Sequence, residues 1–485
     1  FMMVWLNDKK EAIAINYREK APAAATSKMY QDKKGSLIKG KSSKTYLASG
    51  VPGTVAGLVL AQKKYGKLTL SEVMQPAINL AKNGFIVSFK LSDALNNSRK
   101  WLSRSKESKK IFFDKSGISV LKPGDRWKQP DLAKSLSEIA KSDGRSFYEG
   151  SIAKNIIASM KKHGGIITAE DLKSYNATIM KPIQGDYHGY KIYSMPPPSS
   201  GGIILIELLN ILEGYPLARY GLNDARYIHT LAEAMSQAYY DRNLKLGDPD
   251  FIDNPTVQLI SKKYAAEIRN GIYQTKHKPS SEISHKLKPN YESVETTHYS
   301  IIDKDGNMVA NTYTLNYSFG NGYVIENSGF LMNNEMDDFT SKVGEPNAYG
   351  LIQGKSNAIQ PGKRPLSSMT PTLIIDKNNQ PFMATGSPGG SRIITTVLQV
   401  ILNVIDHNLN IQTAVSMPRM HNQLWPDEIR IEQGFSQDTI HILEEMGHTV
   451  TPIDDMGSAQ TVEKNNNLFY GAADPRREGA LAEGY

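Results

Sequence analysis

One segment, residues 296–316, has the residue types and spacing needed for nucleophilic catalysis. Residues 297–302 and 308–316 are rich in β-branched and aromatic side chains and flank a turn at Gly306, which predicts a β-hairpin. Thr296 stands just before the first strand, after a polar stretch with little apolar periodicity. If the peptide bond before Thr296 were cut, the new α-amine could act as a base for the neighbouring hydroxyl. The hairpin alone is more typical of an ordinary structural strand.

A glycine-rich turn could supply a second part of such chemistry. Residues 386–390 read GSPGG and lie between a predicted strand at 381–385 and a predicted helix at 391–407. Backbone N–H groups point outward at such a junction, and the helix dipole favours negative charge there. The turn could therefore hold the oxyanion of an acyl-transfer reaction, where one donor contributes about 3 kcal/mol. A plain tight turn is the alternative interpretation.

Two further motifs look catalytic but lack the required context. Residues 35–42 (GSLIKGKS) match the phosphate-loop pattern, yet no buried strand precedes them and glycine and proline interrupt any following helix. A solvated basic loop is the better interpretation. Ser199 and Ser200 follow three prolines without a G-x-S-x-G elbow, which favours a structural role.

The elements that must position these motifs fall into two groups. Apolar residues at helical spacing predict helices within 55–61, 73–81, 132–139, 152–160, 203–212 and 227–240, after two short strands in residues 1–17. Beyond residue 296, the patterns predict strands at 297–302, 308–316, 329–333, 370–375 and 381–385, and helices at 391–407 and 436–447. Strands packed between helices on both sides indicate an α/β (α+β) fold in a four-layer sandwich.

Composition excludes several classes of function. The 485 residues carry 57 basic and 49 acidic side chains, a net charge of +8, and the lysines are dispersed, so we expect no nucleic-acid partner. The absence of cysteine excludes disulfides and a cysteine nucleophile. The ten histidines include no H-E-x-x-H pattern, so we expect no metal site. No apolar run approaches the roughly 18 residues of a membrane span.

Six motifs in chain order are similar to those of the γ-glutamyltranspeptidase family. Any one of them is weak evidence, but together they cover the chain from near residue 10 to its end. They are YRE at 17–19, PPPSSGG at 196–202, TTHYS at 296–300, NNEMDDF at 333–339, RPLSSM at 364–369 and GSPGGSR at 386–392.

This resemblance implies an N-terminal-nucleophile hydrolase with an αββα sandwich and no cofactor. The precursor would cleave itself between Glu295 and Thr296, giving a large subunit (1–295) and a small subunit (296–485) that together form one αββα unit. Thr296 would attack the γ-carbonyl of glutathione or another γ-glutamyl compound. Its α-amine, with a reference pKa of about 8, would act as the base. The acyl group would pass to water, an amino acid or a dipeptide.

The resemblance also assigns roles to individual residues. Arg18 would clamp the substrate α-carboxylate, a task suited to a planar guanidinium. The other implied roles are hydroxyl donors to that carboxylate (Ser367, Ser368), acceptors for the α-ammonium (Asn316, Glu335, Asp338), a partner for the Thr296 hydroxyl (Thr314), oxyanion donors (Gly389, Gly390) and a lid (Tyr349).

Location and length are further implications of the family. Its members carry a secretion signal and a further segment before the point where this chain begins, so a periplasmic or secreted location is expected. The chain opens on residues that read as part of a strand, without a charged n-region or a cleavage site. We therefore expect that the sequence is a fragment.

Three alternatives remain open at the level of sequence. Cephalosporin (glutaryl) acylases share the nucleophile but bind an acyl group without an ammonium; Asn316, Glu335 and Asp338 favour an amino-acid head group instead. A phosphate-loop nucleotide-binding protein is the second alternative. The third is an unprocessed or inactive homologue, against which the intact Thr296 argues.

Overall fold

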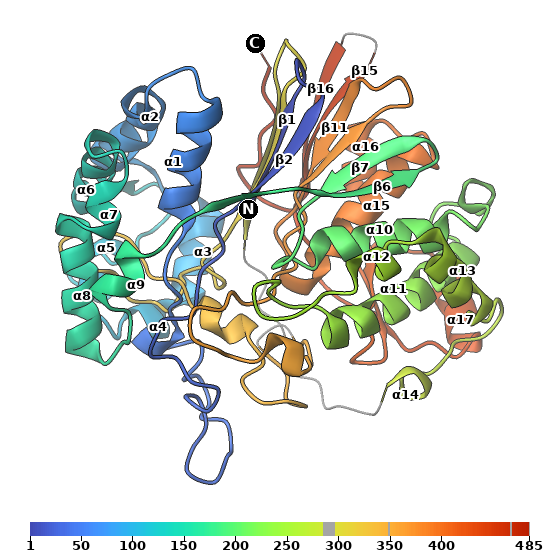
Figure 1. The fold of residues 1–485 in the computed structure, drawn as a ribbon, viewed down its shortest axis with the longest axis horizontal. Helices are drawn as coiled ribbons and strands as arrows, with labels where there is room; N and C mark the ends of the chain where they lie inside the picture. Colours follow the sequence, from blue (N-terminus) through green and yellow to red (C-terminus); the bar gives the residue numbers. More distant parts are fainter. Residues whose placement is uncertain (285–295, 348–349, 466–467, 485) are drawn as a thin grey trace.

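Two antiparallel sheets lie face to face at the centre of the molecule, with helices on both outer sides (Figure 1). The computed structural model describes residues 1–284, 296–347, 350–465 and 468–484. The first sheet has the order β5-β2-β1-β9-β8, formed by Thr178–Met180, Glu11–Asn16, Met2–Leu6, Met308–Tyr313 and Thr297–Ile302. The second has the order β16-β15-β11-β10-β7-β6, formed by Leu468–Ala473, Gln460–Asn465, Pro381–Thr385, Thr372–Ile375, Tyr190–Ser194 and Ile183–Tyr187.

The helices on the side of the second sheet include two that are strongly apolar, α10 (Gly201–Leu212) and α15 (Ile393–Ile405). Helix α10 packs on β6 and β7 and is buried along its whole length, as expected for a helix that is hydrophobic all round. It contacts α11 (Ala225–Lys245) and α15, and α16 (Ile411–Ser416) packs on β15 and β16. Shorter helices complete this side: α12 (Thr256–Leu259), α13 (Lys262–Asn270), α14 (Ser280–Ile283) and α17 (Gln437–Glu445).

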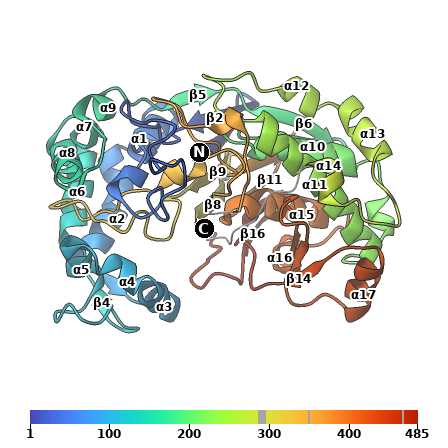
Figure 2. The same ribbon diagram turned by 90° about the horizontal axis from the view of Figure 1, so that it is seen from below.

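The helices on the other side come from the first third of the chain and are amphipathic. Helix α1 (Thr54–Tyr65) packs against β2, and α2 (Leu70–Asn83) pairs with α6 (Pro130–Lys141). The remaining helices of this group are α3 (Phe89–Asn97), α4 (Arg99–Leu102), α5 (Lys106–Phe112), α7 (Arg145–Tyr148), α8 (Ser151–His163) and α9 (Ala169–Lys173). Seen from below, the two helical groups stand on opposite sides of the sheets (Figure 2). The predicted four-layer arrangement is therefore confirmed.

Two small sheets lie outside the sandwich. One joins β12 (Met420–His421), β13 (Ile429–Ile431) and β14 (Val450–Pro452), and the other joins β3 (Phe85–Ile86) and β4 (Arg126–Trp127). The three-stranded sheet and helix α17 both pack near α11.

One predicted strand is wrong. Residues 329–333 make only an isolated bridge, between Val324 and Leu331. Gly329 has a φ of 74°, and a Cβ there would lie 2.4 Å from the backbone nitrogen of Leu132. Phe330 packs on the cluster formed by α7 and α8, so the apolar side chains of this segment are buried by helices and not by a sheet.

The phosphate-loop look-alike has neither flanking element that a phosphate site needs. Residues 31–45 contain only turns and an isolated bridge between Gln31 and Leu37. The hydroxyl of Ser42, which would ligate magnesium in a true phosphate loop, donates to Asp337. The local structure therefore agrees with a solvated loop.

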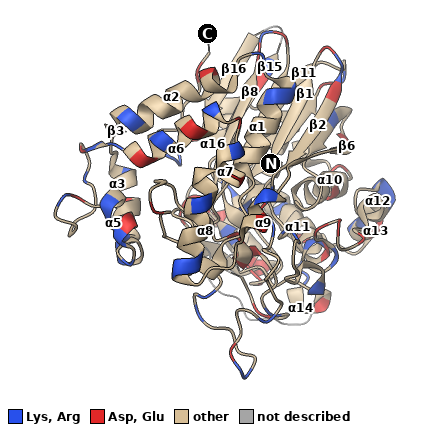
Figure 3. Ribbon diagram, turned by 60° about the vertical axis from the view of Figure 1, so that its left-hand side comes forward, with Lys and Arg blue, Asp and Glu red and all other residues tan. Residues whose placement is uncertain are grey.

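Charged residues of both signs are interspersed over the surface (Figure 3), in agreement with the dispersed lysines of the sequence. Among the residues that the structure describes, none of the helices is both long enough and apolar enough to cross a membrane.

Candidate active site

The hairpin formed by β8 and β9 places Thr296 next to Thr314. Its register pairs Thr297 with Tyr313, so one further step along both strands sets Thr296 opposite Thr314. Thr296 is 8% exposed, and both threonines line the same cavity. The hairpin predicted from the sequence therefore brings a hydroxyl partner to the candidate nucleophile.

His298 serves to anchor this hairpin. Its Nδ1 lies 2.7 Å from the Thr312 hydroxyl and its Nε2 lies 2.9 Å from the Ser300 hydroxyl. Burial lowers the pKa of His298 to about 3, so the ring is neutral at physiological pH. Gly386 makes room for the ring, since a Cβ there would lie 2.2 Å from its Cε1 atom. His298 is thus a structural residue of the strand.

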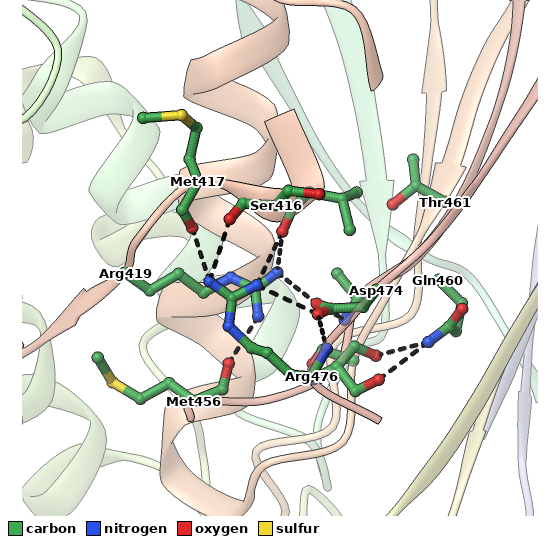
Figure 4. A network of polar contacts seen from close by, with 12 residues as sticks. Ser416, Met417, Arg419, Met456, Gln460, Thr461, Asp474 and Arg476 are labelled. Carbon is green, nitrogen blue, oxygen red and sulfur yellow. Dashed lines mark hydrogen bonds and ion pairs between the residues drawn. The ribbon is translucent and has the colours of Figure 1, made fainter. Parts of the chain in front are cut away.

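The backbone of Thr296 is fixed from the C-terminal end of the chain. Arg477 Nη1 donates to the Thr296 carbonyl oxygen at 2.8 Å. The adjoining residues belong to a buried network of ion pairs (Figure 4): Asp474 accepts from Arg419 at 2.5 Å and from Arg476 at 3.1 Å. A segment held in this way can position Arg477 against Thr296, the residue directly before β8.

One small cavity gathers most of the residues singled out by the sequence. Its polar lining comes from the end of β9, from the 3₁₀ helix η3 (Glu335–Asp338), from the loop that precedes β10 and from the turn that precedes α15. The expected site residues in this lining are Arg18, Thr296, Thr314, Asn316, Asp338, Ser367, Ser368 and Gly390. Gly389 is adjacent in sequence, Glu335 lies behind Arg18, and Tyr349 falls outside the described residues.

Arg18 is buried among three carboxyl groups. Its Nη1 lies 2.6 Å from Glu335 Oε2 and 3.6 Å from Glu19 Oε2, while Nη2 pairs with Asp338. Burial raises the pKa of Glu335 well above its usual range and also raises the pKa values of Glu19 and Asp338, and the attraction of Arg18 only partly offsets this rise. The cluster therefore favours the arrival of a further cation beside Asp338.

The serine pair of the cavity is supported by the proline-rich segment. The Ser200 N–H and hydroxyl donate to the Ser367 carbonyl oxygen at 2.8 and 2.7 Å, and the Ser199 hydroxyl donates to the Met369 carbonyl oxygen at 2.7 Å. These contacts agree with the structural role predicted for Ser199 and Ser200. They hold the Ser367–Ser368 backbone against the start of α10.

The glycine-rich turn joins β11 to α15 as predicted. Gly389 has a φ of 140° and Gly390 a φ of 57°, both in the region that favours glycine. Gly390 begins a 3₁₀ turn, η5 (Gly390–Arg392), that runs directly into α15. The turn therefore sits at a helix N-terminus beside the cavity, the place suited to a developing oxyanion.

Sequence reasoning missed Arg242, which also lines the cavity. It is 1% exposed and donates to Ser368 Oγ at 3.1 Å, and to the side-chain oxygens of Asn243 and Gln353 at 3.0 Å. None of the residues that the structure describes gives it an ion pair, and burial lowers its pKa to about 10. The one local signal for a buried Arg242 is its position on the inner face of α11. The helix predicted from periodicity covered residues 227–240 and therefore ended two residues before it.

Two stacked antiparallel sheets between helices, with a threonine directly before an edge strand and a glycine-rich turn beside the same cavity, are the arrangement of N-terminal-nucleophile hydrolases. The sequence profile described as Gamma-glutamyltranspeptidase matches residues 1–484. The chain therefore belongs to the γ-glutamyltranspeptidase family of enzymes, as the motifs predicted.

Individual relatives agree with this assignment. The glutathione hydrolase proenzyme of Escherichia coli (strain K12) is 50% identical over 474 residues, which cover 97% of this chain and 81% of that protein. The proenzyme of Pseudomonas sp. (strain A14) is 47% identical and covers 100% of this chain and 86% of its own length.

Solved structures give the same picture for the fold. Cephalosporin acylase from Bacillus halodurans has a TM-score of 0.83 at 28% identity, and the match covers 100% of this chain and 87% of the acylase chain. The γ-glutamyltranspeptidase of Helicobacter pylori has a TM-score of 0.57 at 44% identity, and the match covers 59% of this chain and 81% of the Helicobacter pylori chain.

Proposed function

We propose that this chain is the precursor of a glutathione hydrolase and γ-glutamyltransferase that cleaves itself before Thr296. Cleavage yields a large subunit of residues 1–295 and a small subunit of residues 296–485, which stay together as one αββα unit. The donors are glutathione and related γ-glutamyl compounds, and the acceptors are water, amino acids or dipeptides. By family resemblance, the enzyme works in the periplasm or outside the cell.

The proposed reaction uses Thr296 as both nucleophile and base. Its α-amine takes the hydroxyl proton as Oγ attacks the γ-carbonyl carbon, and the amine then gives that proton to the departing nitrogen. Thr314 supports the hydroxyl, and the N–H groups of Gly389 and Gly390 hold the oxyanion. Water or an acceptor amine then attacks the ester by the same path in reverse, and Thr296 is regenerated.

The observation that carries the choice of substrate is the acidic cluster around Arg18. Three carboxyl groups that share ion pairs with one guanidinium, Arg18, favour an acyl group that brings its own ammonium. A glutaryl group brings none, so in the cephalosporin-acylase alternative Asp338 and Glu335 would have only the guanidinium that they already share. The α-carboxylate of the same head group is received by Ser367, Ser368 and the two guanidinium groups of Arg18 and Arg242.

The remainder of the donor has room on the other side of Thr296. A larger, mostly apolar cavity of about 550 Å³ adjoins Thr296 and Thr314, with Phe112, Trp127 and Phe330 among its lining residues. The head group thus occupies the small polar cavity while the leaving group faces the wide one. This arrangement suits an enzyme that is strict for the acyl group and tolerant of what it is attached to.

Arg242→Met should raise KM for a γ-glutamyl donor about 10- to 150-fold, because losing a partner of a charged group costs about 1.5–3 kcal/mol. Self-cleavage should proceed as before, since the bond before Thr296 carries no free α-carboxylate. The measurements are steady-state kinetics and a denaturing gel. Arg226→Met, at an exposed position on the same helix, is the control. Loss of self-cleavage together with activity would mean that Arg242 serves only folding.

The proposed function itself is tested by incubating purified protein and following both cleavage and turnover. A denaturing gel should show two bands, at about three-fifths and two-fifths of the 53.7 kDa chain. The processed protein should release glutamate from glutathione and should prefer a γ-glutamyl anilide to a glutaryl anilide. A stable single band, or a preference for the glutaryl compound, would refute the proposal.

A further inference from the structure

A second cluster of ionisable side chains lies on α11, away from the candidate active site. His229 and Glu233 stand one turn apart on this helix, and His448 comes from the turn between α17 and β14. All three are buried, with exposed fractions of 1%, 3% and 5%. One potential ligand atom from each lies within 4.8 Å of the other two.

The hydrogen bonds of His229 fix which of its nitrogens is available. Its Nε2 lies 2.7 Å from the Tyr273 carbonyl oxygen, which can only accept, so Nε2 carries the proton. The Nδ1 atom of a neutral ring therefore presents its lone pair, and it faces His448 Nε2 at 2.7 Å. His229 is thus oriented as a ligating histidine usually is, with its second nitrogen donating to a backbone carbonyl.

Glu233 is oriented in a comparable way. His277 Nδ1 lies 2.7 Å from its Oε1 atom, and the Lys278 N–H donates to the same oxygen at 3.3 Å. These bonds hold the carboxylate on the side of the two imidazoles. A cavity lined by Glu233, Gln237, Glu267 and Lys278 reaches the cluster and offers a path for an ion and a water molecule.

We propose that His229, Glu233 and His448 bind one divalent transition-metal ion of the zinc type. Two imidazoles and one carboxylate are a ligand set that zinc uses, with a water molecule in the fourth position. Tetrahedral ligands at the usual bond lengths lie about 3.3 Å apart. The ring-to-ring contact at 2.7 Å would therefore open by about 0.6 Å, and His448 would change tautomer as the ion binds, with its one ring proton exchanging through solvent from Nε2 to Nδ1.

The position of the site gives the ion a structural task. His229 and Glu233 belong to residues 1–295, whereas His448 belongs to residues 296–485, so the ion links the two parts of the chain. Asp427 reinforces the same junction, because it accepts from His277 Nε2 at 3.0 Å and from the Ser280 N–H at 2.9 Å. If the precursor is cleaved before Thr296, as proposed above, the ion fastens the large subunit to the small one; binding itself does not depend on cleavage.

The test begins with the wild-type protein after removal of metals by a chelator. Titration with Co²⁺ should produce the strong visible absorption of a tetrahedral site, saturating at one ion per chain, and Zn²⁺ should abolish it. Zn²⁺ should also raise Tm, because an ion that binds only the folded state stabilises it. A wild-type protein without this absorption and without a zinc-dependent shift in Tm would overturn the proposal, and would leave a purely hydrogen-bonded cluster.

Variants locate the ion. His448→Ala should remove the cobalt absorption, and Glu233→Gln, which preserves shape, should weaken metal affinity at least about 10-fold. His441→Ala is the matched control, because His441 pairs with Glu445 on the exposed face of α17 and should leave binding unchanged. Undiminished cobalt absorption in His448→Ala would show that the metal lies elsewhere and would also overturn the proposal.

Discussion

Thr296→Ala should give a single chain that neither cleaves itself nor turns over a γ-glutamyl donor. Both steps need a hydroxyl at the start of β8, and the substitution removes only that group and a methyl. The cavity that Thr296 shares with Thr314, Asp338 and Gly390 would remain, so binding of a γ-glutamyl compound should persist. A denaturing gel and an anilide assay measure the two losses, and a binding assay confirms that the variant is folded.

Two matched variants make this result specific. Thr296→Ser keeps a hydroxyl and should still cleave and turn over, although at a lower rate. Thr297→Ala alters the next residue, which is exposed and paired with Tyr313, and should cleave normally. Two subunits from the alanine variant at 296, or their absence from the variant at 297, would contradict the assignment of the nucleophile.

Asp338→Asn should lower kcat/KM for a γ-glutamyl anilide about 10- to 150-fold and should affect a glutaryl anilide much less. Asp338 lines the cavity, whereas Glu335 is buried behind Arg18, so Asp338 is the carboxylate best placed to receive an ammonium. Losing a partner of a charged group costs about 1.5–3 kcal/mol, which corresponds to that range of rates. The ratio of the two specificity constants is the quantity to measure.

Asp337→Asn is the control for this substitution. The two aspartates are neighbours in η3, but the Asp337 carboxylate accepts from Ser42 and does not line the cavity. It should therefore leave the ratio of the two substrates unchanged. Equal losses on both anilides in Asp338→Asn would show that Asp338 does not recognise the ammonium and would weaken the choice of an amino-acid head group.

Local patterns in the sequence were enough to predict the hairpin and the glycine-rich turn of the candidate site. Alternating β-branched residues around Gly306 predicted the hairpin that opens at Thr296, and its bounds at 297–302 are those of β8. The GSPGG turn was placed correctly between β11 and α15 because glycine tolerance and helix periodicity are properties of a few adjacent residues. The six motifs then identified the family, which local patterns could not have done.

Contacts between residues far apart in the sequence could not be predicted from those patterns and became visible in the folded chain. Arg18 reaches Asp338 across 320 positions, and His229 reaches His448 across 219. Arg242 looks like any other polar residue of a helix until the fold buries it beside Ser368. Residues 329–333 were wrongly predicted as a strand for the same reason, because a short apolar run has the same sequence pattern whether helices or a sheet bury it. Periodicity encodes which face of an element is buried, but the packing of whole elements selects the partner on that face.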